Sequence, residues 1–178
     1  MIFNKTEIEG LYVIETELKS DERGYFSEIF TCEKFLKEGL SFSAERLAQS
    51  LTKKRGTIRG IHFQKEPKAE IKIVQCLKGA IYDVAIDLRP NSLTYRKWFA
   101  QELSEKNKKL FFIPKGFAHG FQTLTGNCQV QYLISGSYSP ENAGGVRWND
   151  PLFNIKWPIK KPTLSEKDKS WHLLHNKN

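Results

Sequence analysis

Along most of the chain, hydrophobic and polar residues alternate in short runs, which is the pattern of half-buried β-strands. Residues 10–16 (GLYVIET) and 24–30 (GYFSEIF) show it near the start. Seven more runs rich in β-branched and aromatic residues follow at short intervals: 57–64, 70–79, 80–88, 97–103, 109–114, 121–125 and 130–138. Gly, Pro and Asn separate these runs as turn signals. Many short strands at regular spacing predict a sandwich or barrel.

Helical spacing is confined to short stretches. In residues 31–40 the apolar positions have helical spacing, Thr31 is a candidate N-cap and Gly39 lies near the end. A second short helix is expected near the C-terminus, after an irregular stretch rich in Pro and Trp. There is no repeat and no linker. We therefore expect residues 1–178 to form one mainly-β domain with a few short helices.

Composition fits a folded, cytoplasmic protein. The chain has 178 residues, of which 39% are hydrophobic, and this is enough for one domain with its own core. Charges interrupt the N-terminal stretch every few residues, unlike the apolar region of a signal peptide. No run approaches the roughly 20 apolar residues that span a bilayer. The three cysteines are widely spaced without a CxxC pair, so we expect reduced, mostly buried thiols.

The formal net charge of +8 could attract nucleic acid, an anionic membrane or a phosphate-bearing small molecule. The basic residues, however, lie in short scattered groups such as 53–55 and 160–161. None of these groups forms a long basic tract. The pattern therefore predicts a solvated basic surface, with no nucleic-acid or membrane partner.

His62, in RGIHFQ, is the first candidate for chemistry. Strand alternation places it on one face with Gly60 and Gln64, and places Arg59 on the other face. A histidine at an inward position is either a hydrogen-bonded core residue or a group that moves protons near neutral pH. The position alone favours the core residue.

Two residues on the following strands share faces with apolar neighbours. Lys72 lies on one face with Val74 and Cys76, so its ammonium group either stabilises an anion in the interior or pairs with a carboxylate. The spacing does not choose between these two roles. Tyr132 is also expected to point inward, either as a core residue with a bonded hydroxyl or as a proton donor.

Other polar residues allow similar pairs of interpretations. Asp83 and Asp87 share one strand face and could be acid/base groups, although structural pairing with Lys or Arg is favoured. His119 lies between two glycines in GFAHGF, where the backbone can approach another strand or a ligand closely. Asp168, taken alone, is an ordinary surface acid.

A metal site is not expected. The chain has four histidines but no HxH pair, and no histidine lies at tight ligand spacing from a carboxylate on a core strand. His172 and His175 lie at helical spacing, but in the C-terminal tail. We therefore predict no metal and no other cofactor.

Several motifs in order resemble the dTDP-4-dehydrorhamnose 3,5-epimerase family: RGIHFQ, a lysine ten residues later, IYDVAIDLRPNS, LFFIPKGFAHGFQTL, WNDP and LSEKD. The similarity runs from about Gly10 to Trp171. It implies a cupin-type jelly-roll β-barrel without a metal, acting as a homodimer whose N-terminal strands cross to the partner. It also implies inversion of C3 and C5 of a dTDP-linked 4-keto-6-deoxyhexose through an enolate, in rhamnose-type deoxysugar and cell-surface polysaccharide biosynthesis.

The resemblance assigns roles residue by residue. His62 matches the general base, Asp168 its carboxylate partner, Lys72 the group that stabilises the enolate, and Tyr132 the proton donor. The residues that match substrate contacts, the first two of them reaching the partner's site, are Arg23, Glu28, Arg59, His119, Tyr138 and Lys167. Of these, Tyr138 matches the ring that stacks on the base.

The chain departs from the family where the nucleotide is held. Leu47, Gln49 and Leu51 occupy the places of a Gln-x-Asn segment and a following serine, and the family's glutamate near 140 aligns with Glu141 or Ala143. These departures leave open a ketoisomerase or single-carbon epimerase acting on a CDP- or GDP-linked 4-keto sugar. A sugar-nucleotide binder without activity, or a metal cupin, is a third hypothesis.

Overall fold

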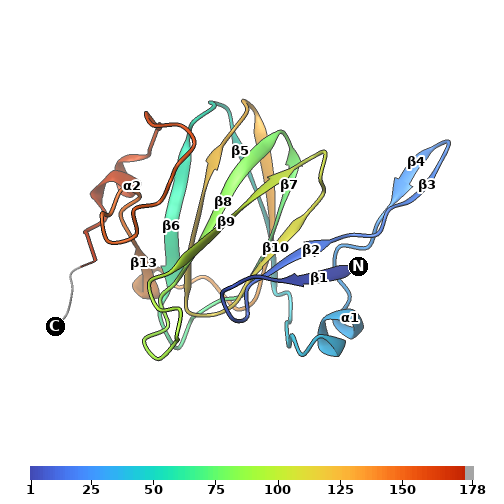
Figure 1. The fold of residues 1–178 in the computed structure, drawn as a ribbon, viewed down its shortest axis with the longest axis horizontal. Helices are drawn as coiled ribbons and strands as arrows, with labels where there is room; N and C mark the ends of the chain where they lie inside the picture. Colours follow the sequence, from blue (N-terminus) through green and yellow to red (C-terminus); the bar gives the residue numbers. More distant parts are fainter. Residues whose placement is uncertain (175–178) are drawn as a thin grey trace.

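The computed structural model of the protein describes residues 1–174 and consists mainly of β-strands (Figure 1). The larger sheet has six antiparallel strands, in the order β1 (Ile2–Lys5), β2 (Tyr12–Glu15), β10 (Leu110–Ile113), β7 (Lys72–Lys78), β12 (Cys128–Ile134) and β5 (Arg46–Thr52). The second sheet has five, in the order β13 (Ala143–Gly145), β6 (Ile58–Gln64), β11 (Phe117–Thr123), β8 (Ala80–Asp87) and β9 (Trp98–Ser104). The two sheets face each other as a cupin-type jelly roll, which confirms the predicted fold class.

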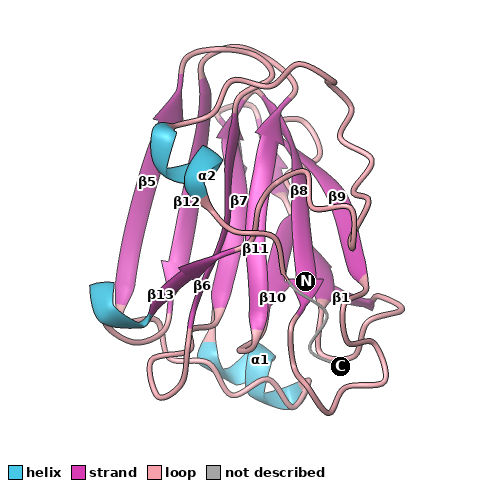
Figure 2. Cartoon of the chain, turned by 90° about the vertical axis from the view of Figure 1, so that its left-hand side faces the viewer, coloured by secondary structure: helices cyan, strands magenta, loops and turns pink. Residues whose placement is uncertain are grey.

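The remaining elements are short. A hairpin of β3 (Lys19–Asp21) and β4 (Gly24–Phe26) extends away from the barrel, as Figure 1 shows. Helix α1 (Cys32–Lys37) lies at one end of the larger sheet (Figure 2), and α2 (Glu166–Ser170) lies beside β6 (Figure 1). A 3-10 turn (Pro140–Asn142) precedes β13.

Sequence periodicity located most elements but not all of them. Thr31 caps α1 as predicted, since its side chain accepts a hydrogen bond from the Lys34 backbone amide. The strand expected at 121–125 is instead β11 and starts at Phe117, so it includes His119 and most of the GFAHGF motif. The strand expected at 24–30 ends at Phe26.

Strand β5 was missed because its polarity is reversed. Leu47 and Leu51 are 68% and 54% exposed on its outer face, whereas Ala48 and Ser50 point inward and line a cavity. A strand with apolar residues outside and small or polar residues inside has no pattern that predicts burial. The short edge strand β1 and the exposed β3 lack such a pattern too.

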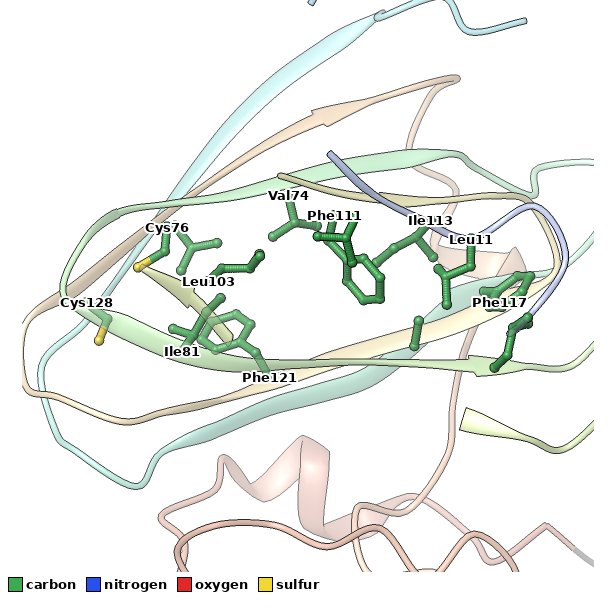
Figure 3. Close-up of a cluster of buried hydrophobic side chains, with 14 residues drawn as sticks. Leu11, Val74, Cys76, Ile81, Leu103, Phe111, Ile113, Phe117, Phe121 and Cys128 are labelled. Carbon is green, nitrogen blue, oxygen red and sulfur yellow. The ribbon is translucent and has the colours of Figure 1, made fainter. Parts of the chain in front are cut away.

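The main hydrophobic core fills the space between the two sheets (Figure 3). Val74 and Phe111 contribute from the larger sheet, and Ile81 and Phe121 from the smaller one, all 2% exposed or less. Burial of this apolar surface is the dominant favourable term in folding. The chain's cysteines are free, with Cys76 and Cys128 buried and Cys32 exposed.

Chain segments outside the strands pack on part of the outer face of each sheet. Aromatic residues from α1 and the following loop, including Phe35 and Phe42, pack on the larger sheet. The C-terminal segment packs Val146 and Phe153 onto the smaller sheet. Within the described part of the chain, no helix has the length and apolar character needed to cross a membrane.

An irregularity in the pairing of β6 with β11 changes the predicted faces of β6. Arg59 pairs with Phe121, and His62 pairs with His119, so three steps along β6 match two steps along β11. An extra residue in one strand is a β-bulge, and it switches the alternation of side chains. Arg59 and His62 therefore line the same cavity, and the prediction that they face opposite sides was wrong.

Two glycines allow this close pairing. Gly60 has φ +120°, and a Cβ atom there would lie 2.6 Å from the Cα of Gly120. A Cβ on Gly120 would in turn lie 2.8 Å from the carbonyl oxygen of Arg59. Both contacts are with backbone, which cannot move aside as the end of a flexible side chain can.

We predict that Gly60→Ala destabilises the fold far more than Gly24→Ala. Gly24 has nearly the same backbone angle, φ +128°, but no atom lies within 4 Å of its Cβ position. Both changes strain the backbone by about 1–3 kcal/mol, and overpacking adds roughly 2 kcal/mol at Gly60 alone. Chemical unfolding of both variants measures the difference. Equal losses in the free energy of unfolding would contradict this account of the strand contact.

Candidate active site

A cavity of about 600 Å³ opens between the two sheets. Side chains from both sheets and from α2 line it, which makes it a concave site of the size that binds small molecules. Those from the five-stranded sheet include Arg59, His62, Gln64 and His119; those from the six-stranded sheet include Ser50, Lys72 and Tyr132; the segments after β12 supply Tyr138, Ala143, Lys167, Asp168 and Trp171.

His62 and Asp168 form a hydrogen-bonded pair in this cavity. The Nε2 atom of His62 lies 2.6 Å from Oδ1 of Asp168, and the two side chains are 42% and 6% exposed. Burial raises the pKa of the Asp168 carboxyl, but hydrogen bonds to His62 and Ser165 and the His62 charge outweigh it, so the pKa lies below its usual value. The ionised carboxylate only accepts hydrogen bonds. In the neutral form of His62, Nε2 therefore carries the proton and Nδ1 keeps a free lone pair.

The C-terminal segment carries Asp168 to this position by pairing along β6 and β11. The buried Gln122 amide exchanges two 2.8 Å hydrogen bonds with the backbone of Ile159. Thr163 then forms a parallel bridge with Thr57. Ser165 caps α2 by accepting a hydrogen bond from the Asp168 backbone amide. A pair separated by 106 residues in sequence is thus positioned by tertiary contacts between the C-terminal segment and the five-stranded sheet.

Lys72 lies in the cavity wall opposite this pair. Its side chain is 13% exposed, and its Nζ lies 3.0 Å from Oε1 of Glu70. Glu70 is itself only 10% exposed. The sequence left two roles open for this lysine, and the structure places it both in an ion pair and at the cavity.

Tyr132 points inward from β12, as predicted. Its hydroxyl lies 3.1 Å from the Ser50 hydroxyl on β5. Burial raises the pKa of Tyr132 well above its usual value, although the Ser50 hydrogen bond opposes this. The phenol therefore stays protonated at neutral pH and is available as a proton donor.

A second histidine–carboxylate pair lies beside the first. His119 Nε2 is 2.6 Å from Asp83 Oδ1, and the side chains are 6% and 0% exposed. Burial raises the pKa of Asp83, with the charge of His119 acting in the opposite direction. Asp87, by contrast, bonds Arg89, Ser92 and other polar groups away from the cavity. The prediction that Asp87 pairs with a cation for a structural purpose is confirmed. Asp83 instead holds His119, a residue that lines the cavity.

Three more predicted residues line the cavity. Arg59 is held by β5, because its Nε donates to Thr52 Oγ1 at 2.8 Å and its Nη2 donates to the Leu51 carbonyl at 3.1 Å. Lys167 reaches the cavity from α2. Tyr138 is 56% exposed at its edge. Together they bring two cations and an exposed aromatic ring to the cavity.

Arg23 and Glu28 do not line this cavity. Arg23, in the β3–β4 turn, bonds Asp21, and Glu28 lies 2.9 Å from Lys34. Arg23 lies in the β3–β4 hairpin, which extends away from the barrel (Figure 1), and Glu28 follows this hairpin in the chain. The structure of one chain therefore does not bring these two residues together with the other predicted site residues.

Sequence reasoning missed Glu70, Ser50 and Trp171. Glu70 precedes Lys72 by two residues, so strand periodicity could have placed both on one face. Trp171 follows α2, and its ring centroid lies 6.1 Å from that of His62; no local pattern signals this contact. Of the two candidates near 140, Ala143 lines the cavity and Glu141 does not.

Among residues 1–174, no cluster of three or more His, Cys, Asp or Glu side chains is arranged to hold a metal ion. His175 lies outside the described residues, and His172 is not among the residues that line the cavity. The absence of a metal in the working protein stays a prediction.

Comparisons with known proteins agree on one family. The sequence model of a family described as dTDP-4-dehydrorhamnose 3,5-epimerase matches residues 5–176. The protein of that name from Methanothermobacter thermautotrophicus is 44% identical, with 97% of this chain and 94% of that protein covered. A Bacillus anthracis dTDP-4-dehydrorhamnose 3,5-epimerase with TDP and pyrophosphate bound has a TM-score of 0.95 at 40% identity, covering 97% and 99% of the two chains. A Legionella pneumophila 3,5-epimerase in complex with dTDP-4-keto-L-rhamnose has a TM-score of 0.92 at 34% identity, covering 97% and 92%.

The lowered pKa of Asp168 predicts how Asp168→Asn changes stability with pH. A carboxyl whose pKa is lower in the folded than in the unfolded chain stabilises the fold above its unfolded value, and this stabilisation is lost as pH falls through the folded value. Wild type should therefore exceed Asp168→Asn in unfolding free energy at pH 6, and the difference should shrink below about pH 4. Urea unfolding at several pH values measures this.

Glu166→Gln is the matched control, since Glu166 lies on the same helix with a side chain that is 90% exposed. It should show no comparable pH-dependent difference. A stability gap for Asp168→Asn that stays constant down to pH 2.5 would show that the carboxylate is not stabilised in the folded chain.

Proposed function

The chain belongs to the dTDP-4-dehydrorhamnose 3,5-epimerase family and is an isomerase that epimerises nucleotide-linked sugars, and we propose how its own residues perform this reaction. The substrate we propose is a dTDP-linked 4-keto-6-deoxyhexose, inverted at both C3 and C5 in rhamnose-type biosynthesis. The ligands in the Bacillus anthracis and Legionella pneumophila structures support this substrate class.

The observation that carries the proposal is the His62–Asp168 pair in a cavity that Lys72 and Tyr132 line from the opposite sheet. Protons next to a ketone are acidic because the carbanion delocalises onto oxygen. His62 Nδ1 takes such a proton from C3 or C5, and Asp168 stabilises the imidazolium that forms. The electron pair of the broken C–H bond becomes the C=C bond of an enolate.

Lys72 stabilises the negative charge that develops on the C4 oxygen of this enolate. Tyr132 then donates its hydroxyl proton to the carbon from the other side, and the carbon centre is inverted. Because His62 belongs to the five-stranded sheet and Tyr132 to the six-stranded sheet, the base and the acid approach the sugar from different walls. The imidazolium and the phenolate return to their starting states by proton exchange with water.

The remaining cavity residues suit the diphosphate and the nucleobase of the substrate. Arg59 and His119 lie next to the proton-transferring groups and offer positive charge or N–H donors to the pyrophosphate. Lys167 provides a further cation on α2. The half-exposed ring of Tyr138 offers a surface on which the nucleobase can stack.

We further propose a homodimer in which the N-terminal region of one subunit completes the partner's cavity with Arg23 and Glu28. Support comes from the protruding β3–β4 hairpin, where Tyr25 and Phe26 are 56% and 63% exposed. The leucines on the outer face of β5 are similarly exposed. Adjacent exposed apolar side chains are typical of surfaces that a partner covers.

Two further proposals rest on the sequence prediction. Residues 1–178 act as one domain, which is supported by the core that both sheets share. The location is cytoplasmic, and fractionation of cells that express the chain tests it.

We predict that the enzyme catalyses uptake of deuterium from D2O at both C3 and C5 of dTDP-4-keto-6-deoxyglucose, followed by NMR in the presence of EDTA. His62→Ala should slow uptake by about 10²- to 10⁴-fold, because the base is lost. Its circular dichroism spectrum should be unchanged.

Other outcomes separate the alternatives. Exchange at one carbon only indicates a single-carbon epimerase, and migration of the keto group from C4 indicates a ketoisomerase. Better turnover of a CDP- or GDP-linked sugar would show that the proposed dTDP nucleotide is wrong. Loss of activity in EDTA would contradict the prediction that no metal is required. No exchange with any of these sugars would remove the proposed substrate class.

Mixed dimers test the contribution of the partner subunit. We predict that Arg23→Ala and His62→Ala subunits are each poorly active alone but recover activity when co-expressed. In the mixed dimer, the site with an intact His62 also receives an intact Arg23 from its partner. About a quarter of wild-type activity is expected, since half of randomly formed dimers are mixed and each has one working site.

The matched control pairs His62→Ala with Lys72→Met. Both residues belong to the same subunit's cavity, so no mixed dimer has a complete site and activity should not recover. If the Arg23→Ala pair also fails to recover, the contact is not made across subunits.

A further inference from the structure

A buried carboxylate, Glu70, lies beside Lys72, the residue that we propose stabilises the enolate. Its Oε1 atom is 3.0 Å from Lys72 Nζ, and both side chains are almost enclosed, with 10% and 13% exposure. Burying a carboxylate and an ammonium group is costly unless the two are paired and hydrogen-bonded. The pair is therefore a built feature of the cavity wall.

The second oxygen of Glu70 is also fully engaged. Its Oε2 accepts a hydrogen bond from Arg46 Nη2 at 2.5 Å and another from Gln64 Nε2 at 3.1 Å. The cluster thus contains two cations and one anion. Arg46 offsets the charge of Glu70, so that Lys72 can be held by a carboxylate while the group keeps a net positive charge.

The same side chains also hold the loop that carries Tyr138. Arg46 Nε donates to the Gly136 carbonyl at 2.7 Å. Gln64 donates to the Ser137 carbonyl at 3.2 Å and accepts from the Ser139 amide at 2.7 Å. The carbonyl and amide groups on both sides of Tyr138 are therefore tied to partners of Glu70.

We propose that Glu70 is a positioning residue, which holds the Lys72 ammonium toward the substrate and links it through Arg46 and Gln64 to the Tyr138 loop. This inference rests on the enolate-stabilising role proposed for Lys72. Glu70 itself does not transfer a proton and does not contact the reacting carbon.

The physical reason lies in the flexibility of lysine. The ammonium group ends a four-carbon chain with several rotamers, and ordering it costs conformational entropy. A charge that is already in place when the enolate forms stabilises the transition state without reorganisation. The Oε1 contact fixes this position before substrate arrives, and the Oε2 contacts fix the carboxylate in turn.

Glu70→Gln tests the inference, because the amide keeps the size of the side chain and removes its charge. We expect kcat for the 4-keto sugar to fall about 10-fold, with KM changed less than about 2-fold, since the loss falls on the transition state. Glu66→Gln, an exposed acid on the neighbouring turn, is the matched control and should behave as wild type. Thermal unfolding establishes that each variant is folded.

A double-mutant cycle separates positioning from general damage. In a Lys72→Met background, which should reduce kcat by about 10²- to 10³-fold, Glu70→Gln should change kcat less than about 2-fold further. Neighbouring residues that act through one contact are non-additive in this way. The same 10-fold loss in both backgrounds, or no loss in the wild-type background, would overturn the proposal.

The possible failures are distinguishable. Full activity in Lys72→Met removes the proposed role of Lys72, whereas an inactive Lys72→Met with a fully active Glu70→Gln removes only the role of Glu70. If Glu70→Gln does not fold, Glu70→Asp takes its place: it keeps the charge but is too short to bridge Arg46 and Lys72. Its kcat should fall at least about 3-fold in wild type and less than 2-fold beside Lys72→Met; an unchanged kcat contradicts positioning.

Discussion

The contact between β6 and β11 at Gly60 and Gly120 is the constraint on which the cavity depends. Only residues without a Cβ let the two backbones approach this closely, and the bulge at this point reverses the alternation of side chains along β6. The side chains of Arg59 and His62 consequently line the same cavity. The guanidinium group is suited to bind a phosphate, and the imidazole is suited to accept a proton. A regular strand would have turned one of them away.

The pairing of His62 with Asp168 joins the middle of the chain to its C-terminal segment. That segment is held by apolar packing on the five-stranded sheet and by backbone hydrogen bonds to β6 and Gln122. The general base of the proposed mechanism is therefore oriented only when this segment has docked. Its partner carboxylate comes from a five-residue helix whose position depends on tertiary contacts rather than on helix propensity.

The acidic side chains in and beside the cavity occur in pairs rather than singly. The buried or half-buried acids Asp168, Asp83 and Glu70 each contact a histidine or a cation. Such pairing offsets the cost of removing a charge from water. Arg59 and Lys167, which are bound to neutral groups or lie near an aromatic ring, leave positive charge available for an anionic substrate.

The sequence by itself determined the barrel class, the capped helix after Thr31 and the inward positions of Lys72 and Tyr132, because strand and cap patterns are local. Its ordered motifs also determined the family. Only the tertiary structure decided that Arg59 shares the face of His62, that β5 presents Ser50 inward, and that Glu70 and Trp171 belong to the site. It also brings Asp168, which the family resemblance assigns to His62, within 2.6 Å of the imidazole. These features depend on a bulge, on an edge strand whose apolar residues face outward, and on contacts between distant segments. None of the three produces a periodic pattern in the sequence. For His62, the strand pattern supplied the position, and the fold supplied the carboxylate that gives its imidazole a defined tautomer.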